Sequence, residues 1–180
     1  CISKAVTHTE NFSRMIAGKE NTASITLTVE PNARGEGNVY VSKLRDDRIP
    51  EDYKDAIERG INACFGSGIA LGYPCTDIKV TVEKIVWSEE SSSEFAFEAC
   101  ANMAFDAACQ AADPILLSPI MKIDCMCPRD FMGEVISSLT MRGGLVNQVE
   151  SRGAIEHIHA EAPLEAMFGY STALRSMTQG

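Results

Sequence analysis

An Asp113-Pro114 pair divides this sequence into two stretches that carry different orders of predicted elements. Proline has no backbone N–H and disfavours helical conformation at the residue before it, so an alanine-rich helix predicted over residues 95–112 has to end at this pair. The segment that follows, 115–119 (ILLSP), leads into a new run of periodic segments, as a linker does. We therefore predict two domains, residues 1–115 and 116–180.

The first stretch contains strand patterns on either side of a helix pattern. Residues 24–30 (SITLTVE) and 77–86 (DIKVTVEKIV) alternate polar and apolar side chains, which is typical of half-buried strands, and residues 39–41 form a weaker strand pattern. Between them, Pro50 and the acidic residues after it open a helix with an apolar stripe that reaches Cys64. These patterns predict an α/β domain.

A serine run precedes the alanine-rich helix. Ser91 and Glu94 have capping-box spacing, so Ser91 is the predicted N-cap of the helix over residues 95–112. The run could also imitate a nucleophile cluster, but a cap satisfies free amide donors and needs no general base. We favour the cap.

The second stretch has a different order of elements. It contains, in sequence, a strand (121–127), a helix (128–141), two strands (145–150 and 155–160) and a helix (163–177). This βαββα order is one strand short of the split βαβ, ferredoxin-like pattern. The predicted fold class is therefore α+β, an α/β domain followed by a ferredoxin-like domain that lacks its last strand.

Composition limits the functional classes. The formal net charge is −9, which argues against a free-standing RNA-binding module, because binding to phosphates usually supplies the affinity of such modules. No apolar run is long enough for a membrane helix, and the first residues lack a signal-peptide pattern, so we expect a cytoplasmic protein without a membrane partner. The seven cysteines are an odd number without a CxxC pair and are interpreted as reduced core residues, with zinc a remote alternative.

No pattern for cofactor chemistry is found in the sequence. The glycines of residues 66–72 follow a helix pattern and precede a strand, the reverse of a dinucleotide fingerprint, and no GxxxxGK[ST] motif is present. His157 and His159 share one face of a predicted strand, but no third ligand has a clear spacing, so no metal site is predicted. An independent small enzyme is disfavoured because no acid, base or nucleophile constellation is found.

Five segments resemble one known family in wording and order: IPEDYKDAIERGI, SGIALGYPCTDIKVTV, SSEFAFEAC, LLSPIMKI and PLEAMFGYSTALRSMTQG. They are similar to the fourth and fifth domains of elongation factor G. The resemblance implies an elongated domain IV-like unit in residues 1–115 and a truncated domain V-like unit in 116–180. It also implies a monomeric, ribosome-binding part of a translational GTPase that promotes movement of tRNA and mRNA, with GTP and Mg²⁺ bound outside this chain.

Two departures from the family bear on function. The usual glycine-rich loop, of the type GGRGQYG, is replaced by residues 17–23 (AGKENTA), and a histidine usual in the second loop is replaced by Ser88. These changes fit a divergent second paralogue, so a ribosome-recycling GTPase is an alternative to a translocation factor. A ribosome-protection protein is another alternative, for which Trp87 is the only indication.

The resemblance implies RNA contacts at the tip loops and in the second domain. Cations would contact phosphates, and an aromatic ring could stack on a base. The tip residues are Arg14, Gly18, Lys19, Glu20, Asn21, Trp87, Ser88, Glu89, Glu90 and Ser91, and those of the second domain are Arg142, Arg152 and Arg175. We expect Lys19 and Trp87 to lie close together at one end of the first domain. From the residues alone, all of these would be solvated surface side chains.

Overall fold

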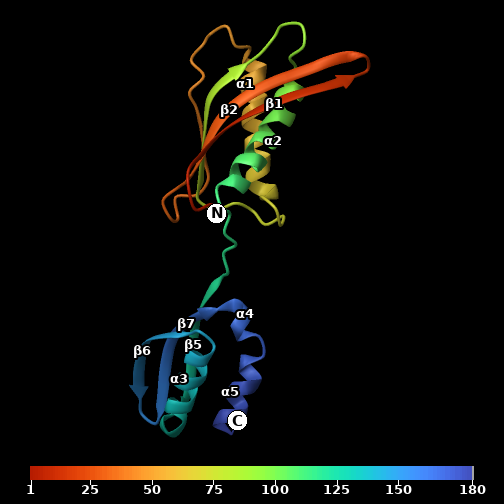
Figure 1. Cartoon of the computed structure of the whole chain (residues 1–180). Coiled ribbons are helices and arrows are strands. Elements are labelled where there is room, and N and C mark those ends of the chain that lie inside the picture. Colours follow the sequence, from red (N-terminus) through yellow and green to blue (C-terminus); the bar gives the residue numbers. More distant parts are fainter. Residues whose placement is uncertain (180) are drawn as a thin grey trace. The chain divides into compact units, whose positions relative to one another are not determined.

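The computed structural model describes residues 1–179. The chain forms two compact units, Cys1–Leu116 and Leu117–Gly180 (Figure 1). Both units combine helices with a sheet, so the predicted α+β class is confirmed.

The first unit is built on a four-stranded sheet in the order β1-β2-β4-β3. Its strands are β1 (Val6–Ile16), β2 (Lys19–Pro31), β3 (Val39–Ser42) and β4 (Ile78–Val86). The pairs β1/β2 and β2/β4 are antiparallel, whereas β3 runs parallel to β4. β1 is therefore one edge strand of the sheet, and β2, the longest strand, lies beside it.

Two helices share the core of this unit, α1 (Glu51–Ser67) and α2 (Glu94–Ala111). Alternate residues of β2, among them Ile25, Leu27 and Val29, have no exposed surface and belong to the same buried cluster as residues of both helices. Gly60 of α1 lets the helices approach closely, because a Cβ there would lie 3.1 Å from the Cβ of Ala101 in α2. Small side chains thus bring the helices together on one face of the sheet.

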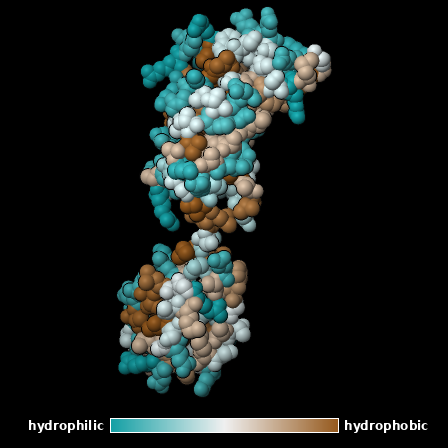
Figure 2. All heavy atoms as spheres, viewed as in Figure 1, coloured by the Kyte–Doolittle hydropathy of each residue, from teal (hydrophilic) through white to brown (hydrophobic). Residues whose placement is uncertain are grey.

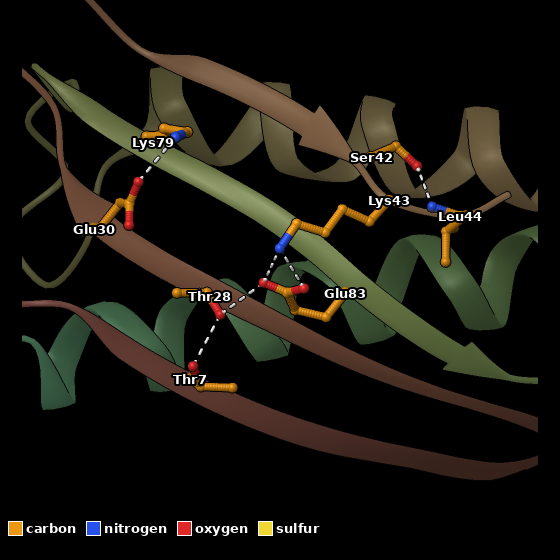
Figure 3. A network of polar contacts seen from close by, with 8 residues as sticks. All are labelled: Thr7, Thr28, Glu30, Ser42, Lys43, Leu44, Lys79 and Glu83. Carbon is orange, nitrogen blue, oxygen red and sulfur yellow. Dashed lines mark hydrogen bonds and ion pairs between the residues drawn. The ribbon is translucent and has the colours of Figure 1, made fainter.

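The opposite face of this sheet is polar (Figure 3). The Thr7 and Thr28 hydroxyls are 2.9 Å apart across β1 and β2, and Thr28 donates to Glu83 at 3.3 Å. Lys43 Nζ donates to the same carboxylate at 2.8 and 3.1 Å. The sheet therefore has one buried and one solvated face, as is common where most strand pairs are antiparallel.

The first unit differs from the sequence-based predictions at two places. Strand β1 was not predicted, because His8 and Glu10 interrupt the apolar alternation on its inner face; the two side chains pair with each other at 2.7 Å. The N-cap of α2 is Ser93 rather than Ser91, and the Ser93 hydroxyl accepts a hydrogen bond from the Ala96 N–H at 3.1 Å. Ser91 is thereby left free for another contact.

The second unit contains a three-stranded antiparallel sheet in the order β5-β7-β6. Its elements are β5 (Ile120–Pro128), the 3-10 helix η1 (Arg129–Phe131), α3 (Met132–Met141), β6 (Leu145–Arg152), β7 (Ile155–Pro163), α4 (Leu164–Met167) and α5 (Tyr170–Thr178). Val135 and Leu139 of α3 pack with Ile158 of β7 and Tyr170 of α5. Hydrophobic residues are exposed on the left of this unit, in the region of β6 (Figure 2), where Leu145 is 66% exposed.

The final predicted helix, 163–177, is interrupted. Phe168 is extended and Gly169 has a φ of 74°, so α4 ends before these two residues and α5 begins after them. Glycine reaches this left-handed region without a Cβ clash, which is why the chain turns there. The helix predicted over 128–141 likewise begins as a separate 3-10 turn.

Six of the seven cysteines are buried, and all seven are free. Burial raises the pKa of the Cys64 thiol to about 11 and the pKa values of Cys100 and Cys109 to about 12. Because the thiolate is the reactive form, these side chains behave as small apolar core residues.

Candidate nucleic-acid interface

A hairpin arm extends past the end of β4 at one end of the first unit. β4 pairs with β2 only as far as Ser24, opposite Val86, so β2 residues 19–23 pair with β1 alone. The strands join through Ala17 and Gly18, whose φ angles are 51° and 78°. Positive φ at both positions is the requirement of a two-residue type I′ turn. The predicted tip loop is therefore a tight turn at the end of a narrow two-stranded arm.

The two faces of this arm carry different side chains. Arg14 lies opposite Asn21, and Ile16 lies opposite Lys19. Because side chains alternate along a strand, these four share the face on which Phe12 and Ala23 are buried nearer the base. We call Arg14, Ile16, Lys19 and Asn21 the cationic face of the arm.

The other face carries Met15 and Glu20. These two residues are opposite each other, and the Ser13 hydroxyl on the same face donates to the Glu20 carboxylate at 3.1 Å. Met15 is 66% exposed. The negative charge of the arm is thereby separated from Arg14 and Lys19, although all of these side chains come from one turn.

The β4–α2 loop lies against the base of the arm. The Thr22 N–H donates to the Ser91 carbonyl oxygen at 2.8 Å, and the hydroxyls of the two residues are 2.6 Å apart. The Ser93 hydroxyl donates to Asn21 Oδ1 at 2.9 Å. The arm and the β4–α2 loop, which are 69 positions apart in sequence when counted from Thr22 to Ser91, therefore lie side by side.

Trp87 is placed differently from the expectation. It follows Val86, which pairs with Ser24, and Ser24 is about 16 Å along β2 from Lys19, so Trp87 lies near the base of the arm. Its half-buried ring packs edge-on against Tyr53, with the centroids 6.0 Å apart. Trp87 and Lys19 share one end of the sheet, but the tryptophan ring belongs to the edge of the core.

The remaining loop residues are exposed and negatively charged. Ser88, Glu89 and Glu90 face solvent, and the Ser88 hydroxyl accepts a hydrogen bond from the Glu90 N–H at 3.3 Å. The tip has a formal charge of −1, because it carries two cations, Arg14 and Lys19, and three acidic residues, Glu20, Glu89 and Glu90. Any phosphate contact there has to use the cationic face.

The three arginines predicted in the second unit differ in their surroundings. Arg142 Nη1 donates to the Ala166 carbonyl oxygen at 2.5 Å, and Arg152 Nη2 donates to Glu150 at 3.1 Å. Arg175 is an exposed residue of the last turn of α5. Arg142 is therefore engaged within the protein, whereas Arg175 presents its side chain to solvent.

Sequence reasoning missed two polar groups. One is the hydrogen-bond network around Ser92 and Ser93. The run of three serines is a signal for it, but we used that run only to place an N-cap at Ser91. The other is Glu156, which is 3% exposed and accepts hydrogen bonds from Arg129 Nε at 2.9 Å and Ser151 Oγ at 2.6 Å. No spacing in the sequence distinguishes this glutamate from its neighbours.

Within residues 1–179, no group of three or more histidine, cysteine or acidic side chains is arranged to hold a metal ion. His159 contacts the Asp124 carboxylate, and His157 lies opposite Met126 and Glu150 in the sheet. Among the helices of this same part of the chain, none is both long and apolar enough to cross a membrane.

Comparison with known proteins agrees with both halves of this description. A family model described as elongation factor G, domain IV, matches residues 1–113, and one described as elongation factor G C-terminus matches residues 115–180. Elongation factor G 1 of Treponema denticola is 45% identical to this chain, and elongation factor G 2 of Treponema pallidum is 37% identical. Each alignment covers 99% of this chain but only 28% and 27% of the respective relative.

A crystal structure of a protein from Thermus thermophilus matches with a TM-score of 0.85 and 30% identity, over 99% of this chain and 27% of that one. The fold is thus that of the C-terminal part of a multidomain translation factor, with its ferredoxin-like second unit. The chain belongs to the elongation factor G family, as its sequence resemblance predicted. It spans little more than a quarter of the length of these relatives.

Proposed function

We propose that this chain is the ribosome-binding C-terminal part of an elongation factor G-like GTPase, and that the cationic face of the arm contacts RNA while tRNA and mRNA move. One observation carries the proposal: Arg14 and Lys19 lie on the same face of an arm that extends beyond the rest of its sheet. A narrow arm of this kind can enter a crowded RNA site, where two cations can each contact a phosphate.

The local charge argues for a contact that depends on shape. The chain carries a net charge of −9, and exposed Glu89 and Glu90 lie in the second loop. Phosphate contacts from two cations give a small salt-dependent gain in affinity, so the rest of the factor has to supply most of the binding. We propose that GTP and Mg²⁺ bind to that remaining part, since these 180 residues contain no phosphate-loop motif.

Two arginines of the second unit belong to the same proposal. Arg152 and Arg175 are exposed and are proposed to contact ribosomal RNA. Arg142 is not included, because its guanidinium is already hydrogen-bonded to a backbone carbonyl. The family resemblance also supports a cytoplasmic, monomeric factor.

A second candidate function is ribosome recycling. It is favoured by Ser88, whose hydroxyl is used inside the loop by the Glu90 N–H, at a position where the family usually has a histidine ring. Such a tip would offer fewer donors to tRNA and would suit subunit splitting better than translocation. The ribosome-protection alternative is disfavoured, because Trp87 packs on Tyr53 instead of extending from the tip.

The test uses the full-length parent factor and ribosomes of the same organism. The Arg14→Ala, Lys19→Ala double variant is compared with the wild type in single-round translocation and in subunit splitting. Arg34→Ala is the matched control, because Arg34 is an exposed cation beyond the other end of β2. We expect the double variant to slow at least one activity severalfold and to reduce the salt dependence of ribosome binding by about one unit of slope per cation.

Equal rates and equal salt slopes for the wild type and the double variant would remove the arm from the proposed RNA contact. Faster translocation than splitting supports the first function, and the reverse order supports recycling.

A further inference from the structure

Ser92 makes four hydrogen bonds at the junction of the arm and the core. Its N–H donates to the Ser88 carbonyl oxygen at 2.9 Å, and its hydroxyl accepts from the Ser88 N–H at 3.0 Å. The same hydroxyl donates to the Thr22 carbonyl oxygen at 2.9 Å, while the Ser92 carbonyl oxygen accepts from the Tyr53 hydroxyl at 3.1 Å. All of its polar groups are therefore used.

These bonds connect three separate elements. Thr22 belongs to β2, Ser88 lies near the start of the β4–α2 loop, and Tyr53 belongs to α1. Tyr53 in turn packs against Phe97 of α2, with centroids 4.9 Å apart, and against Trp87. Ser92 thus links the base of the arm to the rigid helical layer, and no other described residue in the loop contacts both Thr22 and Tyr53 through hydrogen bonds.

The position of Thr22 gives this link its importance. β4 supports β2 only as far as Ser24, and an isolated two-stranded hairpin is marginally stable in water. Bonds from the β4–α2 loop to Thr22 extend the lateral support of the arm beyond the end of β4. Without them, the arm would be held from Ala23 outward only by its own ladder and by the bond from Ser93 to Asn21, and it could pivot about its base.

We propose that Ser92 is a positioning residue that fixes the orientation of the arm, so that the cationic face meets RNA at one angle. The functional part rests on the proposed function, since the orientation matters to activity only if the arm contacts RNA. The Ser92 hydroxyl does not itself touch RNA; it acts through Thr22. Ser91 and Ser93 assist by bonding to Thr22 and Asn21, but neither reaches α1.

The first test measures arm mobility in this chain by amide hydrogen exchange. Ser92→Ala removes the bonds to Thr22 O and Ser88 N, and we expect amides of residues 12–16 and 19–23 to exchange about fivefold faster, as the loss of one net hydrogen bond predicts. Ser92→Thr retains the hydroxyl and should restore slow exchange. Ser13→Ala is the matched control, because its hydroxyl bonds only to Glu20 within the arm.

Trp87 provides a second readout. It is the only tryptophan of the chain and packs on Tyr53, whose hydroxyl binds Ser92. We expect Ser92→Ala to change its emission and increase its quenching by iodide, whereas Ser13→Ala leaves both unchanged. Unchanged exchange in the arm overturns the inference, because Ser92 then does not hold the arm. An equal rise in the exchange rates of amides in α1 and α2 also overturns it, because the variant is then only generally destabilised.

The third test places the same variants in the full-length factor on ribosomes. A loosened arm should slow the activity that the Arg14→Ala, Lys19→Ala variant slows, with ribosome affinity nearly unchanged and with rescue by Ser92→Thr. If the double variant is impaired and Ser92→Ala is not, the positioning inference fails while the proposed function stands. If the arm loosens but the double variant also has full activity, the proposed function fails and the positioning role for RNA falls with it.

Discussion

The guanidinium carbon of Arg142 lies 5.0 Å from the centroid of the Tyr170 ring. Arg142 follows α3 and Tyr170 begins α5, so this cation–π contact joins α3 to α5. The additional bond from Arg142 to the Ala166 carbonyl oxygen fixes the end of α4 against them. An arginine that the family resemblance implied as an RNA contact is therefore part of the internal structure.

We expect Arg142→Ala to lower the free energy of unfolding of the second unit by about 2 kcal/mol, the sum of a cation–π contact and a charged hydrogen bond. Urea denaturation followed by amide exchange in α3 and α5 measures this. Arg175→Ala, an exposed arginine in α5, should change the same quantity by less than about 0.5 kcal/mol. Similar losses for both variants would show that Arg142 has no special structural role.

The turn of the arm is expected to be strained at Ala17. Its φ of 51° is in the left-handed region, which costs alanine about 1 kcal/mol but is tolerated by asparagine. Because Asn-Gly is a preferred type I′ pair, Ala17→Asn should stabilise the hairpin by about 0.5–1 kcal/mol. The measurement is the exchange rate of arm amides, which should slow severalfold.

The matched change at the next position has the opposite sign. Gly18 has a φ of 78°, and a Cβ added to it would meet no other atom within 4 Å, so Gly18→Ala is penalised by backbone conformation alone. We expect its arm amides to exchange faster than those of the wild type. If Ala17→Asn and Gly18→Ala shift exchange in the same direction, the type I′ assignment is wrong.

Glu156 gives the second unit an acid-sensitive stability. The Ser151 hydroxyl and then the Arg129 guanidinium hold the pKa of this carboxyl below its usual value. Because the folded-state pKa is depressed, the carboxylate stabilises the fold above the unfolded pKa of about 4.3, and this stabilisation is lost as the pH falls through the folded pKa. We therefore expect the urea concentration at the unfolding midpoint of the second unit to decrease as the pH is lowered from about 5 to below about 4.

The variant Glu156→Gln tests this assignment. It should lower the midpoint at pH 7, since a neutral amide is a weaker partner for Arg129, and it should flatten the decline below about pH 4. Glu165→Gln is the control, because Glu165 is exposed on α4. An unchanged pH profile in Glu156→Gln would assign the acid sensitivity to other carboxylates.

Periodicity predicted the elements whose inner faces are uniformly apolar. Ile25, Leu27 and Val29 identified β2, because one side of that strand is entirely buried. β1 was not predicted because His8 and Glu10 occupy inner positions, where they hydrogen-bond to each other. No local sequence pattern indicates that such a pair can lie on an inner face. The same limit applies to the interruption at Gly169, where glycine permits a turn without requiring one.

Only part of the candidate site could be predicted, because some of its contacts join residues far apart in sequence. The cations Arg14 and Lys19 could be named from sequence, and their common face follows from the turn type, which needs positive φ at Ala17 and Gly18. The positioning role of Ser92 could not be predicted, because Ser92 and Thr22 are 70 positions apart and meet only once β2 and β4 are paired. Long-range hydrogen bonds between loops depend on sheet register, which single-sequence patterns do not specify.

Ser88 stands where the family usually has histidine. Ser88 is exposed, and its hydroxyl makes only the 3.3 Å bond with the Glu90 N–H, whereas its backbone groups bond to Ser92. Ser88→His therefore keeps the backbone bonds and adds a ring that can donate to RNA or stack on it. We expect it to raise single-round translocation by the full-length factor severalfold and to leave subunit splitting unchanged.

Glu89→His is the control, because it places the same ring at the neighbouring exposed position and also removes a negative charge. If charge alone limits the tip, Glu89→His should stimulate translocation more than Ser88→His. If the position of the donor limits it, only Ser88→His should do so, since the hydrogen bonds of Ser92 to Ser88 orient that residue and not its neighbour. A wild-type factor that already translocates as fast as an ordinary elongation factor G would show that neither limits it, and the recycling alternative would lose its structural support.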